Sequence, residues 1–261
     1  DVYKRQEPGC AGLVGGGHRA FARADRPAHR QPYAGGNCAV ADGGNCCDQE
    51  WRGTDAEKAV GSGGRVTVIA IVLAAGQGSR FRAEAGADQD KLLAPCVGLD
   101  GVTRPVIEQV LRNLPRRVEK RWLVTSPERA EVIGLAKAYG CQVVLLDSSG
   151  MGDSIAAAVK ASGPADGWLV VLGDMPFIQS STIERVIDAL EDGAISVPVQ
   201  AGAYGHPVAF DRAFGPRLLA LVGDRGARSL FSDAALKEVL VLDPGVLWDV
   251  DTPRLLSFNA D

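Results

Sequence analysis

The sequence has no long apolar run, no excess of positive charge and few aromatic residues. Its longest strongly apolar run, Val66 to Ala75, has about half the length that a bilayer-spanning helix requires, so we expect no membrane partner. The formal net charge of −4 supplies no chain-wide positive field for a polyanion, so we expect no nucleic-acid partner. Any phosphate group that this chain binds must therefore be held at a local site.

The six cysteines form no recognisable framework. Four of them precede residue 65 without a CxxC pair, and adjacent Cys46 and Cys47 suit tetrahedral zinc poorly, which favours incidental thiols over a metal cluster. Cys96 and Cys141, in the remaining chain, show no spacing that indicates a disulfide scaffold. This pattern is typical of a reducing compartment, and we expect a cytoplasmic protein.

Residues 1–64 differ in composition from the rest of the chain. They hold 13 of the 32 glycines but only six Val, Leu or Phe and neither Ile nor Met. With so little to bury and no apolar periodicity, they are not expected to form a packed domain. Residues 1–6, DVYKRQ, back-translate to a sequence that resembles the transposon-end adaptor of sequencing libraries. We therefore expect 1–64 to be an unstructured or non-native leader, and 65–261 to be the functional domain.

From residue 65 onward, apolar runs alternate with amphipathic segments. The run Val66–Leu73 is rich in β-branched residues, as in a strand that is covered on both faces. Further strands are expected at 122–125, 142–146, 168–172, 195–199, 207–210 and 238–242, and helices at 105–114, 128–139, 153–161, 181–190, 212–221 and 227–234. The series predicts an α/β fold of three layers, with a mostly parallel sheet between helices. Working residues should then lie at the carboxyl ends of the strands.

The segment Leu73–Arg80, LAAGQGSR, follows the first expected strand. Gly76 and Gly78 would let backbone N–H groups approach an anion, and Arg80 could pair with phosphate oxygens. Phe81 stands where a dinucleotide fingerprint needs a third glycine, and no GKS or GKT follows, so neither that fingerprint nor a P-loop is favoured. A tight turn between strand and helix would explain the glycines but not Arg80.

Three further polar motifs carry candidate site residues. Lys91 in DKLLAP could return to the same phosphate site, although a lone lysine is more often a solvated charge. Asp174 in GDMP ends an apolar strand, where it could hold Mg²⁺ or simply form a turn. In DVDTP, Asp249 and Asp251 would share one face if the segment is extended; Asp251 could instead cap a helix that begins near Pro253.

Seven motifs occur in the order found in the MobA-like nucleotidyltransferases: LAAGQGSRF, DKLLAP, GMGDS, GDMP, GHPVAF, GDRGAR and DVDTP. The match spans Val66 to Leu256, and among these enzymes the chain most closely resembles the molybdenum cofactor cytidylyltransferases. The resemblance implies a Rossmann-like nucleotidyltransferase fold. It also implies magnesium-dependent transfer of CMP from CTP to the phosphate of the molybdopterin-type molybdenum cofactor, with release of pyrophosphate. A recipient molybdoenzyme would be a further partner.

The resemblance assigns roles to individual residues. Lys91, Arg80 and Asp174 would be catalytic, with Lys91 neutralising charge around the α-phosphate. Asp174 would be the principal Mg²⁺ ligand and Asp251 the second. His206, Asp224 and Arg228 would lie on the acceptor side. The nucleotide would be bound by Leu73, Ala74, Ala75, Gly76, Gly78, Ser79, Arg80, Lys91, Gly150, Met151, Gly152, Ser154 and Asp174.

Some features depart from the family pattern. Asp153 replaces a usually small residue in the GMGDS motif, and the segments 84–88 and 97–104 are longer than expected. An anionic acceptor needs no general base, so His206 is interpreted as a turn residue or a pterin contact rather than a proton acceptor. Two other functions stay open. One is a related nucleotidyltransferase that uses GTP or another phosphorylated acceptor. The other is a non-catalytic accessory protein that binds the cofactor.

Overall fold

The computed structural model describes residues 39–40, 67–147 and 150–258. Its strands are β1 (Ala39–Val40), β2 (Val68–Leu73), β3 (Pro95–Val97), β4 (Thr103–Pro105), β5 (Arg121–Thr125), β6 (Gln142–Leu145), β7 (Gly167–Leu172), β8 (Ala194–Gln200), β9 (Ala203–Tyr204), β10 (Val208–Asp211) and β11 (Ala235–Leu240). Its helices are α1 (Ser79–Ala85), α2 (Val106–Asn113), α3 (Ala130–Ala138), α4 (Met151–Ser162), α5 (Ser180–Asp188) and α6 (Gly215–Leu219). Shorter 3₁₀ turns are η1 (Arg212–Phe214), η2 (Ala227–Asp233), η3 (Pro244–Leu247) and η4 (Pro253–Leu256).

Of the segment predicted to be a leader, the structure describes only β1, which pairs antiparallel with β6. The remaining residues of 1–64 lie outside the described residues, so the assignment of this segment stays a prediction. The described residues contain no helix that is long and apolar enough to cross a bilayer.

One mixed sheet forms the centre of the fold. Its strands follow the order β1-β6-β5-β2-β7-β10-β8-β11, and β9 pairs with β8. The pairs β6/β5, β5/β2, β2/β7 and β8/β11 are parallel, whereas β10 runs antiparallel to both of its neighbours. The chain adds β5 and β6 on one side of β2 and then crosses to β7 on the other. This reversal places a crevice at the carboxyl ends of β2 and β7, where open α/β sheets bind ligands.

The alternation of side chains along β2 explains why helices cover both faces. Val68, Ala70 and Val72 enter one buried cluster, while Ile69 and Ile71 enter another. Burying a side chain of this size stabilises the fold by about 1.5–3 kcal/mol. Both faces of the strand therefore need a cover, which confirms the predicted three-layer α/β architecture.

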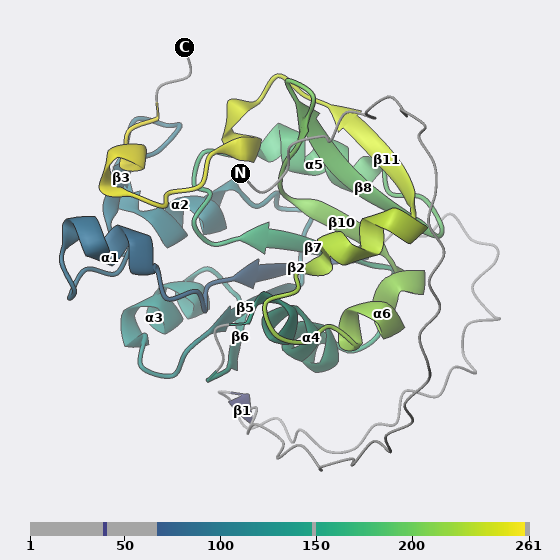
Figure 1. Cartoon of the computed structure of the whole chain (residues 1–261), viewed down its shortest axis with the longest axis horizontal. Helices are drawn as coiled ribbons and strands as arrows, with labels where there is room; N and C mark the ends of the chain where they lie inside the picture. The colour runs from purple at the N-terminus through teal and green to yellow at the C-terminus, as the bar shows by residue number, and fades with distance from the viewer. Residues whose placement is uncertain (1–38, 41–66, 148–149, 259–261) are drawn as a thin grey trace, which may run out of the picture.

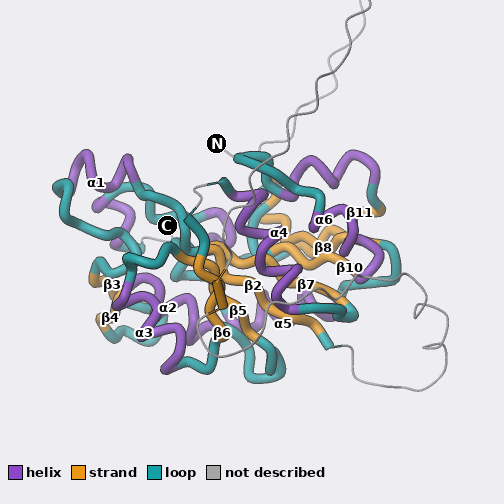
Figure 2. Tube along the Cα trace, turned by 90° about the horizontal axis from the view of Figure 1, so that it is seen from below, coloured by secondary structure: helices purple, strands orange, loops and turns teal. Residues whose placement is uncertain are grey.

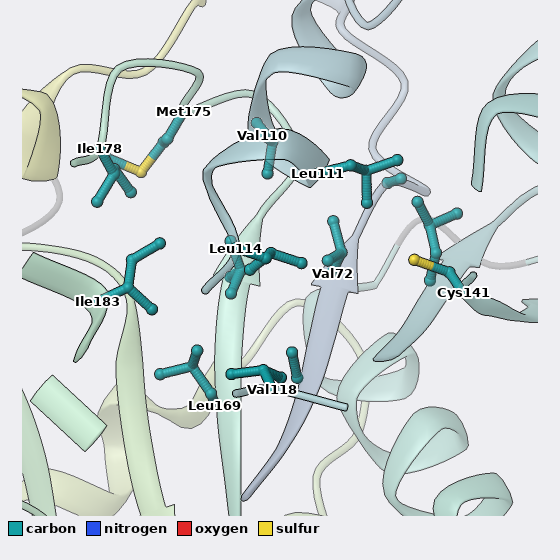
Figure 3. Packing of buried hydrophobic residues seen from close by; sticks show 14 of the residues in the cluster. Val72, Val110, Leu111, Leu114, Val118, Cys141, Leu169, Met175, Ile178 and Ile183 are labelled. Atoms are coloured by element: carbon teal, nitrogen blue, oxygen red, sulfur yellow. The ribbon is translucent and has the colours of Figure 1, made fainter. Parts of the chain in front are cut away.

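Two sets of helices supply these covers. Apolar residues of α2, α3 and α5 pack into the cluster that contains Val72, and those of α4 and α6 pack into the other. Figure 2 shows the two sets on opposite sides of the strands. Figure 3 shows how Leu111 and Leu114, at the end of α2, meet Val72 and Leu169 from the two central strands.

A third, smaller cluster joins the C-terminal segment to the start of the domain. It contains Phe81 of α1, Phe177 and Val250, all of them almost completely buried. Phe258 stacks on Phe177 with ring centroids 4.7 Å apart. Figure 1 shows the yellow C-terminal segment lying beside α1 and β3. This packing holds the DVDTP motif next to the glycine-containing motif, although the two are far apart in the sequence.

Several elements differ from the sequence prediction. The helix α1 is not among the helices for which the sequence predicted bounds. The expected helix 212–221 divides into η1 and α6, because Gly215 and Pro216 start a new helix. The expected helix 227–234 is instead the 3₁₀ turn η2 (Ala227–Asp233), in which Ser229 and Ser232 donate hydroxyl hydrogen bonds to carbonyls three residues earlier. The last strand begins at Ala235 rather than at residue 238, because Ala235 already pairs with Ala194 of β8.

Candidate active site

The crevice at the carboxyl ends of β2 and β7 brings the predicted motifs together. Leu73 and Leu172 are paired in register, so both strands end at the same level. The Gly173 N–H donates to the Leu73 carbonyl over 2.9 Å, and the Val250 N–H donates to the Asp174 carbonyl over 2.9 Å. Backbone hydrogen bonds therefore tie three separate segments of the chain to one place.

Four charged side chains meet in this crevice. The Lys91 ammonium lies 2.5 Å from Oδ2 of Asp174 and 3.4 Å from Oδ1 of Asp251. Arg80, which is largely exposed, donates to the other carboxylate oxygen of Asp251 over 2.7 Å. The four residues expected to surround a triphosphate are thus linked in one continuous network, which we call the charge cluster.

The charge cluster favours the ionised forms of Lys91 and Asp251. Burial opposes the charge on Lys91, but the carboxylates of Asp174 and Asp251 outweigh it and raise the Lys91 pKa above its ordinary value. Burial likewise opposes the charge on Asp251, but Lys91 and Arg80 bring its pKa below the usual range. For Asp249, burial and the nearby carboxylates of Asp251 and Asp174 together raise the pKa. Asp249 is therefore a third carboxyl group beside the charge cluster.

The segment that carries Asp249 and Asp251 is not extended, although the two carboxyl groups lie close together. The chain turns between them, with the Asp251 N–H donating to the Asp249 carbonyl over 3.1 Å. Asp251 faces Lys91, whereas Asp249 lines a cavity on the side of Asp174. Nor does Asp251 cap the following turn, because η4 has Thr252 at its N-cap position and no capping side chain.

The chemistry of Asp174 and Asp251 suits a hard divalent cation. Each supplies a carboxylate, and Mg²⁺ usually takes one or two carboxylates and completes its shell with water and phosphate oxygens. The described residues contain no group of three His, Cys, Asp or Glu side chains that could hold a metal by themselves. Asp174 and Asp251 thus supply two carboxylates for a cation whose remaining ligands would be water and phosphate oxygens.

The glycine loop, residues 74–78, borders the charge cluster. Gly78 has a φ of +61°, in the left-handed region that favours glycine, and immediately precedes α1. Arg129, in the turn after β5, donates to the carbonyls of Ala74 and Gly76 over 2.7 Å each. The Nε of the same guanidinium lies 3.2 Å from Oδ2 of Asp90, the residue before Lys91.

Two cavities lie near the site, one beside the glycine loop and one beside the charge cluster. A polar cavity of about 720 Å³ is lined by Asp90 and Arg129 together with Ala75 and Gln77 of the glycine loop. A more apolar cavity of about 570 Å³ reaches Asp174 from another side. Its walls include Met151, Phe231, Val246, His206, Asp224, Arg228 and Asp249. All three residues predicted for the acceptor side thus line one cavity, together with Asp174.

The GMGDS motif is joined to the acceptor-side motif rather than to the glycine loop. The Gly152 N–H donates to the Gly223 carbonyl over 2.8 Å, and Asp153 accepts the Gly223 N–H over 2.9 Å. A Cβ on Gly152 would lie 2.7 Å from the Arg225 carbonyl oxygen. Ser154 is buried and donates to the Gly150 carbonyl within α4. The predicted nucleotide contacts of Gly150, Met151, Gly152 and Ser154 stay predictions.

His206 is buried at the apolar cavity. Burial lowers its pKa to about 4, against the opposing effects of the Asp174 carboxylate and a hydrogen bond with the Val170 backbone. The imidazole is therefore neutral at physiological pH. A neutral ring in an apolar wall agrees with its interpretation as an acceptor contact.

A family model described as the MobA-like NTP transferase domain matches residues 70–239, more than half of the chain. The chain belongs to this family. The matched region of this MobA-like domain contains the glycine loop, Arg80, Lys91 and Asp174, and Asp251 follows it in the sequence.

Curated relatives of the MobA-like domain include larger proteins. The bifunctional protein GlmU of Burkholderia ambifaria is 30% identical over 129 residues, which are 49% of this chain and 26% of GlmU. GlmU of Cereibacter sphaeroides is 33% identical over 153 residues, which are 55% of this chain and 32% of GlmU. The chain thus spans about a quarter to a third of the length of these relatives.

Solved structures resemble the MobA-like domain over most of their length. An Rv0371c homologue from Mycobacterium sp. strain JC1 is 28% identical with a TM-score of 0.61, over 74% of this chain and 96% of that one. A nucleotidyl transferase from Methanothermobacter is 26% identical with a TM-score of 0.60, over 72% and 93%. Rv0371c of Mycobacterium tuberculosis, in complex with manganese, is 25% identical with a TM-score of 0.54, over 67% and 88%.

Sequence reasoning missed two features of the site. It gave no role to Arg129, although an arginine in the turn that follows the strand β5 is in a position to reach a neighbouring loop. It also overlooked Phe231, which lines the apolar cavity from η2. No spacing in the sequence connects Phe231 with Asp174, because packing of η2 against the sheet is a long-range event.

Proposed function

We propose that this MobA-like domain transfers CMP from CTP to a molybdopterin-type molybdenum cofactor in the presence of Mg²⁺. The observation that carries the proposal is the charge cluster itself. Lys91, Arg80, Asp174 and Asp251 meet at the carboxyl ends of β2 and β7, beside a glycine loop with its polar cavity and beside an apolar cavity that reaches Asp174. A site with this composition suits a triphosphate, a divalent cation and a second substrate at the same time.

Each residue of the charge cluster would have a separate role in an in-line displacement at the α-phosphorus. Asp174 and Asp251 would hold Mg²⁺, which would neutralise phosphate charge when bound. Lys91 would lie beside the α-phosphate, where its ammonium would stabilise charge on the equatorial oxygens. Arg80, being exposed, would pair with the outer phosphates. An acceptor phosphate oxygen attacks the α-phosphorus and pyrophosphate leaves, so the reaction needs positioning and electrostatics rather than a covalent intermediate.

The apolar cavity supports a flat heterocyclic acceptor. Met151, Phe231 and Val246 offer an apolar surface of the kind on which a pterin could lie. The polar groups of His206, Asp224 and Arg228 could form hydrogen bonds with the edge of the pterin ring. The cavity reaches Asp174, so an acceptor phosphate at its mouth would lie near the α-phosphate. Transfer of the product to a molybdoenzyme, and a cytoplasmic location, belong to the same proposal.

Two alternatives are tested by the same experiment. The base preference rests on loop contacts, so GTP or a different phosphorylated acceptor is the second candidate, and the curated GlmU relatives make another acceptor a specific possibility to test. A non-catalytic cofactor-binding protein is the third. The direct pairing of Lys91 with Asp174 favours catalysis, because a protein that only binds has less use for it.

The decisive experiment measures pyrophosphate release from CTP, GTP, ATP and UTP, with Mg²⁺ and with or without the molybdenum cofactor. The proposal expects release from CTP only when the cofactor is present. Release with GTP, or with a different phosphorylated acceptor, would replace the proposed substrates. Binding of nucleotide and cofactor without any release would show an accessory role.

A further inference from the structure

The guanidinium of Arg129 lies where three parts of the site meet. It contacts the carbonyls of Ala74 and Gly76 in the glycine loop and the carboxylate of Asp90. Its side chain is 11% exposed, and its contact with the Ala74 carbonyl is partly buried, whereas that with the Gly76 carbonyl is exposed. The backbone of Arg129 is itself anchored, since its N–H donates to the Ser126 carbonyl and its carbonyl accepts from Ile133 in the first turn of α3. The turn between β5 and α3 thus holds the Arg129 guanidinium against the glycine loop.

The direction of the two carbonyls sets the direction of the neighbouring amides. In a planar trans peptide the carbonyl of one residue and the N–H of the next point in opposite directions. Because the carbonyls of Ala74 and Gly76 point toward Arg129, the N–H groups of Ala75 and Gln77 point away from it. A loop that presents N–H groups attracts phosphate oxygens, whereas one that presents carbonyls repels them. Arg129 therefore selects the peptide orientation that an anion requires.

The contact with Asp90 extends this control to Lys91. Oδ2 of Asp90 faces Arg129, while Oδ1 accepts the Leu92 N–H over 3.0 Å. The two contacts fix the backbone on both sides of Lys91. The ammonium group of Lys91 is consequently held toward Asp174 by a backbone that is tied to the same guanidinium as the glycine loop.

We infer that Arg129 is a positioning residue that sets the glycine loop and Lys91 in register for a nucleoside triphosphate. The inference rests on the proposed nucleotidyl-transfer function of the site. It assigns separate consequences to the two kinds of contact. The contacts with the Ala74 and Gly76 carbonyls shape nucleotide binding, and the contact with Asp90 places Lys91 for turnover.

The test compares Arg129→Ala and Arg129→Lys by steady-state pyrophosphate release. We expect the alanine variant to raise KM for the nucleotide about tenfold and to lower kcat about tenfold, because charged hydrogen bonds are lost on both sides. We expect the lysine variant to keep kcat within about threefold while KM stays raised about tenfold, because an ammonium can pair with Asp90 but lacks the fork that spans two carbonyls. Equal kinetics per folded molecule in all variants would overturn the inference.

Arg121→Ala is the matched control. Arg121 is the first residue of β5, the strand that Arg129 follows. Its guanidinium also donates to two backbone carbonyls, those of Val118 and Pro115. It lies at the amino end of β5, the opposite end from the site. We expect it to change KM and kcat by less than about twofold even where it lowers the Tm.

A second measurement separates this inference from the proposed function. Hydrogen exchange of the free protein should show faster exchange of the Leu92 amide in Arg129→Ala than in the wild type or in Arg121→Ala, because Asp90 is no longer held. Unchanged exchange would overturn the inference whatever the activity. If the wild type releases no pyrophosphate from any nucleotide, the proposed function fails. Faster exchange would then still support the tether between Arg129 and the Lys91 segment.

Discussion

The α-carbon of Gly78 faces the aliphatic part of the Lys91 side chain. A Cβ at residue 78 would lie 3.3 Å from both Cγ and Cδ of Lys91, tighter than an ordinary contact. The backbone of Gly78 is also left-handed, with a φ of +61°. The glycine thus serves two purposes, because it closes the turn into α1 and leaves the space in which Lys91 extends to Asp174.

Gly78→Ala should therefore lower activity by more than its loss of stability explains. The left-handed backbone costs an alanine about 1–2 kcal/mol, and the added methyl group pushes on Lys91 as well. Gly140→Ala is the control, since Gly140 has a φ of +73° and open space around its α-carbon. We expect comparable losses of Tm in both variants but a fall in kcat only for Gly78→Ala. A similar kcat for the two variants would contradict the steric argument.

Asp174→Asn should abolish most turnover while the fold stays intact. The change removes the charge that pairs with Lys91 and holds the cation but keeps the size, and losses of about 100-fold or more are usual for such electrostatic groups. Asp233→Asn is the control, because its ion pair with Arg217 is exposed. Pyrophosphate release and circular dichroism provide the measurements. Near-normal Mg²⁺-dependent activity of Asp174→Asn would exclude the assigned role.

Lys91→Ala should lower kcat more than it weakens nucleotide affinity. Lys91 is held against two carboxylates, in a position to stabilise charge that develops on the α-phosphate during displacement. Calorimetric binding of the nucleotide, measured beside steady-state kinetics, separates the two effects. The reverse pattern, with a large loss of affinity and an unchanged kcat, would make Lys91 a ground-state contact.

His206 should make the protein less stable in acid. Its pKa is about 4 in the folded state, below the ordinary value of 6.5, because burial disfavours the imidazolium. The unfolded chain therefore binds a proton more readily between these values. The stability present above pH 6.5 is lost as pH falls toward 4, by about 3 kcal/mol. Urea unfolding of His206→Asn should show a shallower decline over this range, and an equally steep decline would refute the assignment.

Asp153→Ser should affect the acceptor more than the nucleotide. The Asp153 carboxylate accepts a hydrogen bond from the Gly223 N–H, at the start of the loop that carries Asp224 and Arg228. Serine has too short a side chain to keep this bond at the same geometry, so the loop should become less ordered. We expect a higher KM for the acceptor, by up to about tenfold, and a nearly unchanged KM for the nucleotide. An effect confined to the nucleotide would instead link Asp153 to the base or ribose.

The sequence predicted the layered fold and most element positions, because local patterns carry that information. The apolar run of β2 needs burial on both faces, and the amphipathic stripe of α2 needs a sheet to pack on. It also placed Lys91 and Asp174 among the candidates, through motifs at the ends of strands. It could not predict the 3₁₀ form of 227–233, because there local hydroxyl hydrogen bonds compete with the α-helix.

Taken alone, the order of apolar runs and polar motifs determined that this chain is an α/β protein and which residue types are available for phosphate chemistry. Only the tertiary structure decided that Asp251 rather than Asp249 contacts Lys91 and that Arg129 holds the glycine loop. It also decided that the acceptor-side residues line one cavity with Asp174. The physical reason is that these contacts join segments far apart in the chain. Their partners are chosen by strand order and by the packing of the C-terminal segment, which no local pattern encodes.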